Sequence, residues 1–438
     1  MLRFLSCFFT CVVTSLYFFP FEFTALPGLN TKMLMAAVGL VICGYHLIQK
    51  HEFRVSNELF TLSLISFGIS LMALFSVAYN STPDYTYVTY FISMWVWLSA
   101  AYVVCTMIHK VHGKLTVELV CHYLIVICVT QCIMAIIIDY VPSVKNIVDT
   151  YISQDQVFLN HINRLYGIGA WLDVAGTRFA ACLVIIVFLL HKNRFKIAAN
   201  RLCFYIISYL IVTVVGSIIA RTTLVGNVIS LIYLLCILKS CNVISPTKAI
   251  KLWGWILLLL FVIISIISYL YDTNEQFKKL FRHGFEVFFN WFEKGSIETN
   301  STNKLKDMYV FPETLKTWIL GDGYYINPYR TDMYYIGQKY YAAGYYMLTD
   351  VGYLRFIFYF GLIGLLGFLS LIIVSTRLLI NKLPQYKYLF LMFMAVNLIV
   401  WFKVSTDIFL VFALFFAIPP EDNAEYDKLV AIKNEDTI

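Results

Sequence analysis

The chain has 438 residues, of which 60% are hydrophobic and 13% charged, and its mean hydropathy is +0.75. This composition excludes a soluble globular protein, because a packed core needs a polar shell around it. The net charge of +7 does not indicate a nucleic-acid partner, since the basic residues lie in short connections between apolar runs.

Apolar runs of about 18 residues or more recur along the chain, a pattern typical of membrane-spanning helices. The strands of a membrane barrel would alternate with a period of two, and these runs do not. We therefore predict an all-α polytopic membrane protein with about twelve transmembrane helices. The predicted spans are 4–20, 33–48, 58–79, 88–108, 117–138, 178–190, 203–219, 222–238, 252–270, 351–376, 388–402 and 406–418. The span at 178–190 is short, so it is expected to begin earlier.

Lys and Arg gather in alternate connections, a distribution typical of the cytoplasmic side. They occur near 50–54, 110–114, 192–201, 239–251 and 377–387. The connections 20–31 and 80–86 contain none. We therefore predict that both chain ends are cytoplasmic and that two long segments, 139–177 and 271–349, lie on the outer side.

These assignments predict four parts. They are a membrane domain at 1–270 with its first outer loop at 139–177, a large outer loop at 271–350, C-terminal membrane helices at 351–420 and a cytoplasmic tail at 421–438. Loops as long as the two outer ones are usually functional. The active region is expected in them.

The large outer loop begins with a segment of helical periodicity, 276–295, whose phenylalanines form one stripe and whose charges lie mostly off it. This pattern predicts a helix that rests in the membrane interface. The rest of the loop is rich in tyrosine, including Tyr324, Tyr325 and Tyr345. These rings are interpreted either as an aromatic belt at headgroup depth or as platforms on which sugars stack.

Several arginines are predicted at the outer ends of spans. Arg221 lies in the turn GSIIARTTLVG, and Arg164 and Arg178 lie in the glycine-rich stretch NRLYGIGAWLDVAGTRFAA. A cation in such a position is either a binding residue or an end residue whose side chain reaches the surface. Asp173, in the same stretch, is a weaker candidate for a functional residue than the arginines.

Arg282 and His283 lie on the predicted interfacial helix. Arg282 stands four residues before Glu286 and either pairs with it or binds phosphate. Guanidinium groups at headgroup depth suit a lipid-linked phosphate or pyrophosphate, because they bind phosphate oxygens in a fork and keep their charge.

Three motifs in order carry a resemblance to a known family. They are ARTTLVG, then WILGDGYY at the end of the long outer loop, then TDVGYLRFIFYFGLIGLLGF. Over about 163–368 the chain resembles the bacterial O-antigen polymerase and ligase superfamily, whose members are GT-C-type glycosyltransferases of the inner membrane. The resemblance implies an undecaprenyl-pyrophosphate-linked glycan as donor at the periplasmic face, with no metal, other cofactor or nucleotide sugar.

The resemblance also implies roles for particular residues. Arg221 and Arg164 match the two arginine motifs that the family assigns to the donor pyrophosphate. Ligases typically carry a histidine just before the span at 351–376, where this chain has Leu348, Thr349 and Asp350. The departure favours a polymerase of the Wzy type over a ligase.

Transfer of a glycan to a hydroxyl also needs a base. Asp350, at the membrane boundary, is the first candidate, although Asp is equally suited to cap the helix that follows. Asp322 in LGDGYY is the second, and its flanking glycines indicate a tight turn. Arg355, further into the span, is expected to extend its side chain back towards the surface.

The sequence therefore predicts a polymerase of O-antigen or capsule repeat units, with a chain-length regulator and a flippase as expected protein partners. The alternatives are an O-antigen ligase and a transporter or flippase of lipid-linked sugars. Transporters usually contain repeats and broken helices at the midplane, whereas this chain concentrates its polar residues in two outer loops, which favours chemistry at the surface.

Overall fold

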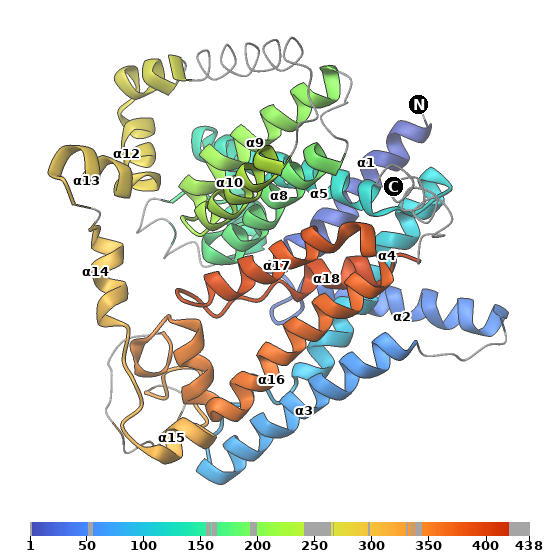
Figure 1. Ribbon diagram of the computed structural model, residues 1–438, viewed down its shortest axis with the longest axis vertical. Helices are drawn as coiled ribbons and strands as arrows, with labels where there is room; N and C mark the ends of the chain where they lie inside the picture. Colours follow the sequence, from blue (N-terminus) through green and yellow to red (C-terminus); the bar gives the residue numbers. More distant parts are fainter. Residues whose placement is uncertain are drawn as a thin grey trace, which may run out of the picture. The chain divides into compact units, whose positions relative to one another are not determined.

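The computed structural model describes residues 2–50, 56–154, 159, 164–192, 199–240, 264–265, 267–296, 298–329, 332–333, 335, 337 and 344–419 (Figure 1). The long helices are α1 (Leu2–Phe18), α2 (Thr31–Lys50), α3 (Asn57–Asn80), α4 (Tyr90–His112), α5 (Val117–Tyr140), α8 (Leu172–Lys192), α9 (Ala199–Ile219), α10 (Thr223–Ser240), α16 (Gly352–Lys382) and α17 (Lys387–Val400). The short helices are α6 (Pro142–Tyr151), α12 (Glu275–Gly284), α13 (Glu286–Lys294), α14 (Asn300–Asp307), α15 (Leu315–Leu320) and α18 (Phe409–Phe416). Two short strands, β1 (Glu22–Phe23) and β2 (Ile152–Ser153), pair antiparallel with Phe23 opposite Ile152.

The prediction of an all-α membrane protein is confirmed. In the described part of the chain, seven helices are long and apolar enough to cross a membrane, namely α2, α3, α4, α5, α8, α9 and α16. Three shorter apolar helices are α1, α10 and α17. The predicted count of twelve is not confirmed, because most of the span predicted at 252–270 lies outside the described residues and α18 has only 8 residues. As expected, the helix predicted at 178–190 begins earlier, at Leu172.

The chain forms two compact units. Unit 1 contains 1–20, 28–124 and 305–438, and unit 2 contains 21–27 and 125–304. The sequence placed its domain boundaries after residues 270, 350 and 420, whereas the chain passes from one unit to the other after residues 20, 27, 124 and 304.

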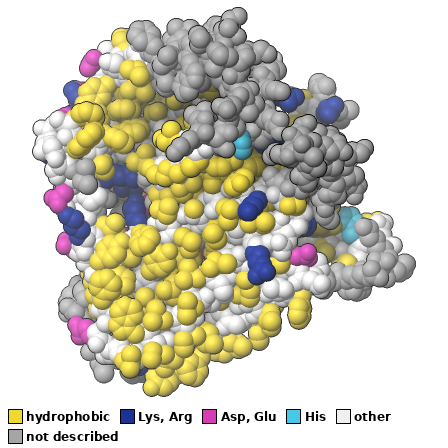
Figure 2. Space-filling view, viewed as in Figure 1, with side chains coloured by type: hydrophobic (Ala, Val, Ile, Leu, Met, Phe, Trp, Pro, Cys, Tyr) yellow, Lys and Arg dark blue, Asp and Glu magenta, His cyan; other side chains and the backbone are white. Residues whose placement is uncertain are grey.

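Helix α3 in unit 1 exposes its large apolar side chains and buries small ones. Its exposed side chains are large and apolar and recur at helical spacing: Phe60, Leu64, Phe67, Leu71 and Phe75. Its buried residues include the small Ser66, Ser70 and Ala73. Figure 2 likewise shows hydrophobic side chains over much of the visible face, with few charged ones. This arrangement is that of a lipid-facing helix, which packs through small residues and exposes large ones.

Helices α2 and α4 pack closely through Gly39, where a Cβ would collide with the backbone oxygen of Ser99. We expect Gly39→Ala to destabilise the fold by about 1–3 kcal/mol, because the two backbones must separate to admit the methyl group. Gly44→Ala on the same helix is the matched control, since a Cβ there meets no atom within 4 Å. Thermal unfolding of the two purified variants in detergent measures the difference. Equal melting temperatures would contradict the close approach.

Helix α16 is broken at Phe360 and Gly361, where Gly361 has φ 70°. The break lets α15 pack against α16, and a Cβ at Gly361 would collide with the backbone oxygen of Ile319. The break is filled by α15 of the same chain.

Unit 2 is held by glycine contacts between helices. A Cβ at Gly226 in α10 would collide with the backbone of Ala180 in α8, and Gly284 at the end of α12 lies against Ile218 in α9. The second contact brings α12 beside the turn between α9 and α10, which contains Arg221.

The predicted interfacial helix at 276–295 is two helices, α12 and α13, that meet at Phe285. Phe281 stacks on Phe277, and its ring lies 4.8 Å from that of Phe285, so the apolar stripe packs on itself. The stripe was predicted from the sequence, and the break was not.

Candidate functional site

A cavity of about 450 Å³ lies in unit 2 at the C-terminal end of α5. It collects three cations from three segments: Lys145 from α6, Arg164 from the following loop and Lys279 from α12. The other lining residues are Ala135, Ile138, Asp139, Leu159, Leu165, Tyr166, Gln276, Leu280 and His283. The one carboxylate among these residues is Asp139, against three cations. Its Oδ2 accepts a hydrogen bond of 2.7 Å from Gln276. The cavity is suited to an anion.

The loop that carries Arg164 is fixed by polar side chains. Gln131 of α5 accepts a hydrogen bond from the backbone of Ile168 (2.9 Å), and Gln154 accepts one from Gly169 (3.1 Å). A Cβ at Gly167 would collide with the side chain of Gln131. Gly167 therefore allows the loop to pack closely against α5.

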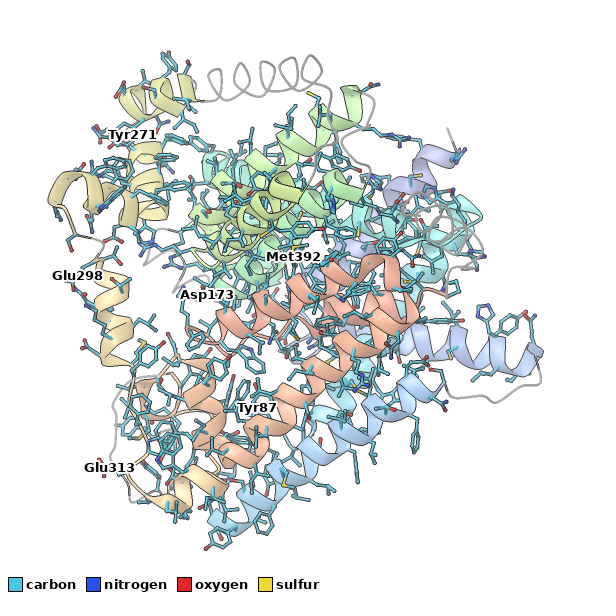
Figure 3. All side chains as sticks on the ribbon, in the orientation of Figure 1. Tyr87, Asp173, Tyr271, Glu298, Glu313 and Met392 are labelled. Atoms are coloured by element: carbon cyan, nitrogen blue, oxygen red, sulfur yellow. The ribbon has the colours of Figure 1, made fainter. Side chains whose placement is uncertain are left out.

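Burial lowers the pKa of Arg164, and Arg221 lowers it further, while Asp173 raises it. Asp173, at the start of α8 (Figure 3), accepts a hydrogen bond of 3.0 Å from Thr222 in the turn that contains Arg221. The structure thus brings Arg164, Arg221 and Asp173 close to one another. The sequence grouped Arg282 with the two arginines, and Arg282 instead pairs with Glu293.

Arg221 forms the ion pair with Glu286 that the sequence predicted for Arg282. Its Nη2 lies 2.5 Å from Glu286 Oε2, and its Nε donates to the backbone oxygen of His283 (3.1 Å). The predicted pairing of Arg282 with Glu286 is wrong, because the break between α12 and α13 ends the helical spacing of four residues. Arg282 instead pairs with Glu293 at 2.6 Å.

Arg282 lies outside the cavity. It donates to Tyr271 (3.0 Å; Figure 3) and stacks over Phe289, and its side chain is 41% exposed. Arg178 is 5% exposed within α8. It therefore does not mark an exposed start of that helix.

His283 lies between these charges. Burial is the main cause that lowers its pKa to about 4, and the neighbouring Arg221 and Arg164 add to the effect. Because the folded protein takes up this proton less readily than the unfolded chain, His283 reduces stability as the pH falls from about 6.5 to about 4. At neutral pH it is uncharged.

A second cavity of about 290 Å³ adjoins the first and shares Leu165 and Leu280 with it. Its remaining lining residues are Ile136, Tyr140, Val214, Val215, Ile218, Leu270, Asn274 and Phe277. It is almost wholly apolar. A charged cavity and an apolar cavity therefore lie next to each other between α5, α9 and α12.

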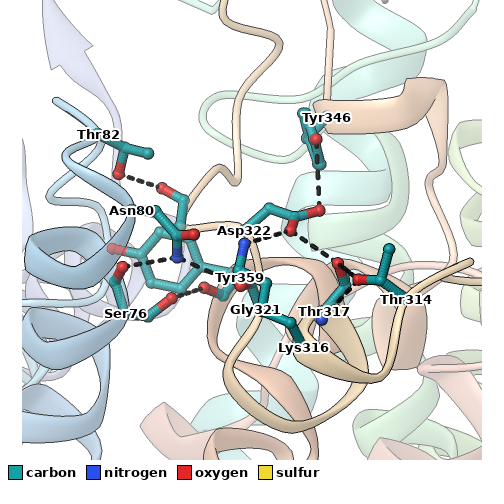
Figure 4. Close-up of polar contacts among 11 residues, drawn as sticks. Ser76, Asn80, Thr82, Thr314, Lys316, Thr317, Gly321, Asp322, Tyr346 and Tyr359 are labelled. Atoms are coloured by element: carbon teal, nitrogen blue, oxygen red, sulfur yellow. Dashed lines mark hydrogen bonds and ion pairs between the residues drawn. The ribbon is translucent and has the colours of Figure 1, made fainter. Parts of the chain in front are cut away.

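The predicted carboxylate Asp322 is in unit 1, in the turn after α15 (Figure 4). It pairs with Lys316 (2.9 Å) and accepts a hydrogen bond from Thr317 (2.8 Å). Gly321 and Gly323 have φ 77° and 73°, which confirms the tight turn. These contacts give Asp322 a structural role.

Asp350, also in unit 1, does not cap α16. The N-cap residue is Val351, which makes no side-chain cap hydrogen bond. Asp350 therefore does not occupy the N-cap position, and its half-buried carboxylate remains a candidate base.

Arg355 does not extend towards the surface as the sequence predicted. Its side chain is buried, with 4% of the residue exposed. The guanidinium carbon lies 3.8 Å from the ring centre of Tyr325 and 3.0 Å from that of Tyr345. Its Nη1 donates a hydrogen bond of 2.6 Å to Ser405. Tyr324 is buried and donates to Asp332 (2.6 Å). Of the three tyrosines proposed to contact glycan, Tyr345 is the most exposed, at 39%.

Sequence reasoning missed Asp139, Lys145, Lys279 and Gln276. Asp139 and Gln276 are joined by a hydrogen bond across 137 positions of the chain, so no local motif connects them. The available signal was the placement of all four in the two outer loops.

Among the residues that the structure describes, no group of three or more His, Cys, Asp or Glu side chains is placed to hold a metal ion. Comparison of the chain with known protein families, curated proteins and solved structures finds no match.

Proposed function

We propose that the protein is a polymerase of lipid-linked oligosaccharide repeat units in the bacterial inner membrane. It would transfer a glycan from undecaprenyl pyrophosphate to a second lipid-linked repeat unit at the periplasmic face. The observation that carries the proposal is the pair of adjoining cavities in unit 2, one basic and one apolar.

The two cavities fit the two parts of a lipid-linked phosphate. Lys145, Arg164 and Lys279 supply positive charge for phosphate oxygens. The cavity that shares Leu165 and Leu280 suits the first isoprene units of the tail. A soluble sugar phosphate would gain nothing from the apolar part.

The same cations support the chemical step. When the glycan leaves, negative charge builds on the pyrophosphate, and fixed cations in a partly buried site stabilise that charge more than water does. The acceptor hydroxyl also needs a base. Asp350, the first candidate from the sequence, lies in unit 1, and Asp139 is the carboxylate that lines the basic cavity in unit 2.

The resemblance noted in the sequence favours a polymerase over a ligase, since Leu348, Thr349 and Asp350 occupy the positions where ligases carry a histidine. A transporter would also bind the lipid-linked glycan. As a polymerase, the protein would work with a chain-length regulator and a flippase as partners.

Deletion of the gene, with the wild-type gene returned as control, tests the proposal. A polymerase deletion leaves surface glycan with a single repeat unit. A ligase deletion leaves lipid-linked polymer that never reaches the lipid A core. A flippase deletion leaves repeat units on the cytoplasmic side, and either of the last two results would overturn the proposal.

A further inference from the structure

His283 is joined to Arg221 through both its backbone and its ring. Its Nδ1 lies 3.2 Å from Arg221 Nη2, and its backbone oxygen accepts from Arg221 Nε. A guanidinium group has five N–H donors and no acceptor. The ring nitrogen that faces it must therefore be the acceptor, without a proton.

This contact decides where the ring proton lies. A neutral imidazole carries one proton, so an accepting Nδ1 places the proton on Nε2. In the structure Nε2 is buried and has no hydrogen-bond partner among the described residues. His283 also lines the basic cavity, so the ring that carries this unpartnered N–H borders an anion site.

We propose that His283 is a neutral hydrogen-bond donor that binds the phosphate group of the ligand through Nε2–H, in a tautomer fixed by Arg221. The inference rests on the proposed function and adds to it a binding residue and a proton position. Glu286 accepts a hydrogen bond of 2.5 Å from the same Nη2 of Arg221 that donates to His283 Nδ1, so the order of contacts is carboxylate, guanidinium, imidazole and anion.

The surrounding charges favour the neutral ring. Arg221 approaches from the turn between α9 and α10, Arg164 from the loop before α8, and Glu286 from α13. The same cavity is lined by Lys145, Lys279 and Asp139. The two arginines oppose protonation and outweigh Glu286, which favours it. A neutral donor also adds a hydrogen bond to the anion while keeping the ring free of a charge beside two arginines.

The first test is the tautomer itself, in the full-length protein in detergent without ligand. In ¹⁵N-histidine-labelled protein we expect the His283 signals to show an unprotonated Nδ1 and a protonated Nε2, unchanged from about pH 8 to about pH 5. The signals are assigned as those lost in His283→Gln. A protonated Nδ1, or a ring that titrates near its ordinary pKa of about 6.5, would overturn the proposal.

The second test is binding of farnesyl pyrophosphate and of inorganic pyrophosphate, measured by calorimetry. We expect His283→Ala to weaken binding by about 10-fold or more, because a hydrogen bond to a charged ligand is lost. His283→Gln places an amide N–H near the position of Nε2 and should bind within about threefold of the wild type. His283→Asn reaches only the position of Nδ1 and should behave like the alanine variant.

The pattern of variants separates binding from structure. If Asn restores binding and Gln does not, His283 acts by contacting Arg221, and the proposal is wrong. Wild-type binding by His283→Ala, or no pyrophosphate binding by the wild type, also overturns it. If the binding pattern holds but deletion of the gene leaves long glycan chains, the proposed polymerase function fails and the anion site stands.

Discussion

Replacing Arg164 by alanine is expected to abolish long glycan chains while the protein still inserts and folds. Arg164 is the arginine that lines the basic cavity, and its loop is fixed by Gln131 and Gln154, whose hydrogen bonds go to other residues. Loss of one fixed donor at a developing negative charge typically lowers the rate by about 10²–10³-fold. Glycan length on gels of the complemented deletion strain, with protein level measured in parallel, gives the result.

Arg282→Ala is the matched control, because Arg282 lies outside the cavity in an exposed pair with Glu293. Exposed ion pairs contribute about 0–1 kcal/mol to stability, so this variant should keep normal chain length. The reverse result, with Arg282→Ala inactive and Arg164→Ala active, would contradict the site in unit 2. It would favour the sequence prediction for Arg282.

Asp350→Asn is expected to lose polymerisation by about 10²–10⁴-fold, the usual contribution of a general base. The residue at the N-cap of α16 is Val351, so the asparagine variant removes the negative charge without disturbing a cap. Polymer formation from purified lipid-linked repeat units in proteoliposomes measures the effect. Normal melting behaviour in detergent should accompany the loss.

Two further variants test this assignment. Asp322→Asn removes the pairing with Lys316 and should lower the melting temperature modestly while leaving the chemical step intact. Asp139→Asn removes the carboxylate that lines the basic cavity. An inactive Asp139→Asn together with an active Asp350→Asn would move the role of base to Asp139.

The regular elements were largely predictable because their signals are local. The exposed face of α3 repeats Phe60, Leu64 and Phe67 at helical spacing, so the sequence alone indicates a helix in lipid. The break in α16 at Gly361 was not predictable in the same way. It depends on the backbone of Ile319, which lies 42 positions earlier in the chain.

The candidate site was partly predictable. Arg164 and Arg221 stood out because a cation at the end of an apolar run is costly and therefore informative. Their partners did not stand out. The spacing of four residues predicted that Glu286 pairs with Arg282. In the structure Glu286 pairs with Arg221, which lies 65 positions before it in the chain.

The sequence by itself determined that the chain crosses a membrane and that its polar residues gather in two long loops. Both conclusions follow from hydrophobicity along the chain, which local composition fixes. Only the tertiary structure decided that Lys145, Arg164, Lys279 and His283 line one cavity beside an apolar one. It also decided that Arg221 fixes the proton of His283. Such contacts depend on how α9 and α12 pack around Gly284, and no local pattern in the sequence encodes that packing.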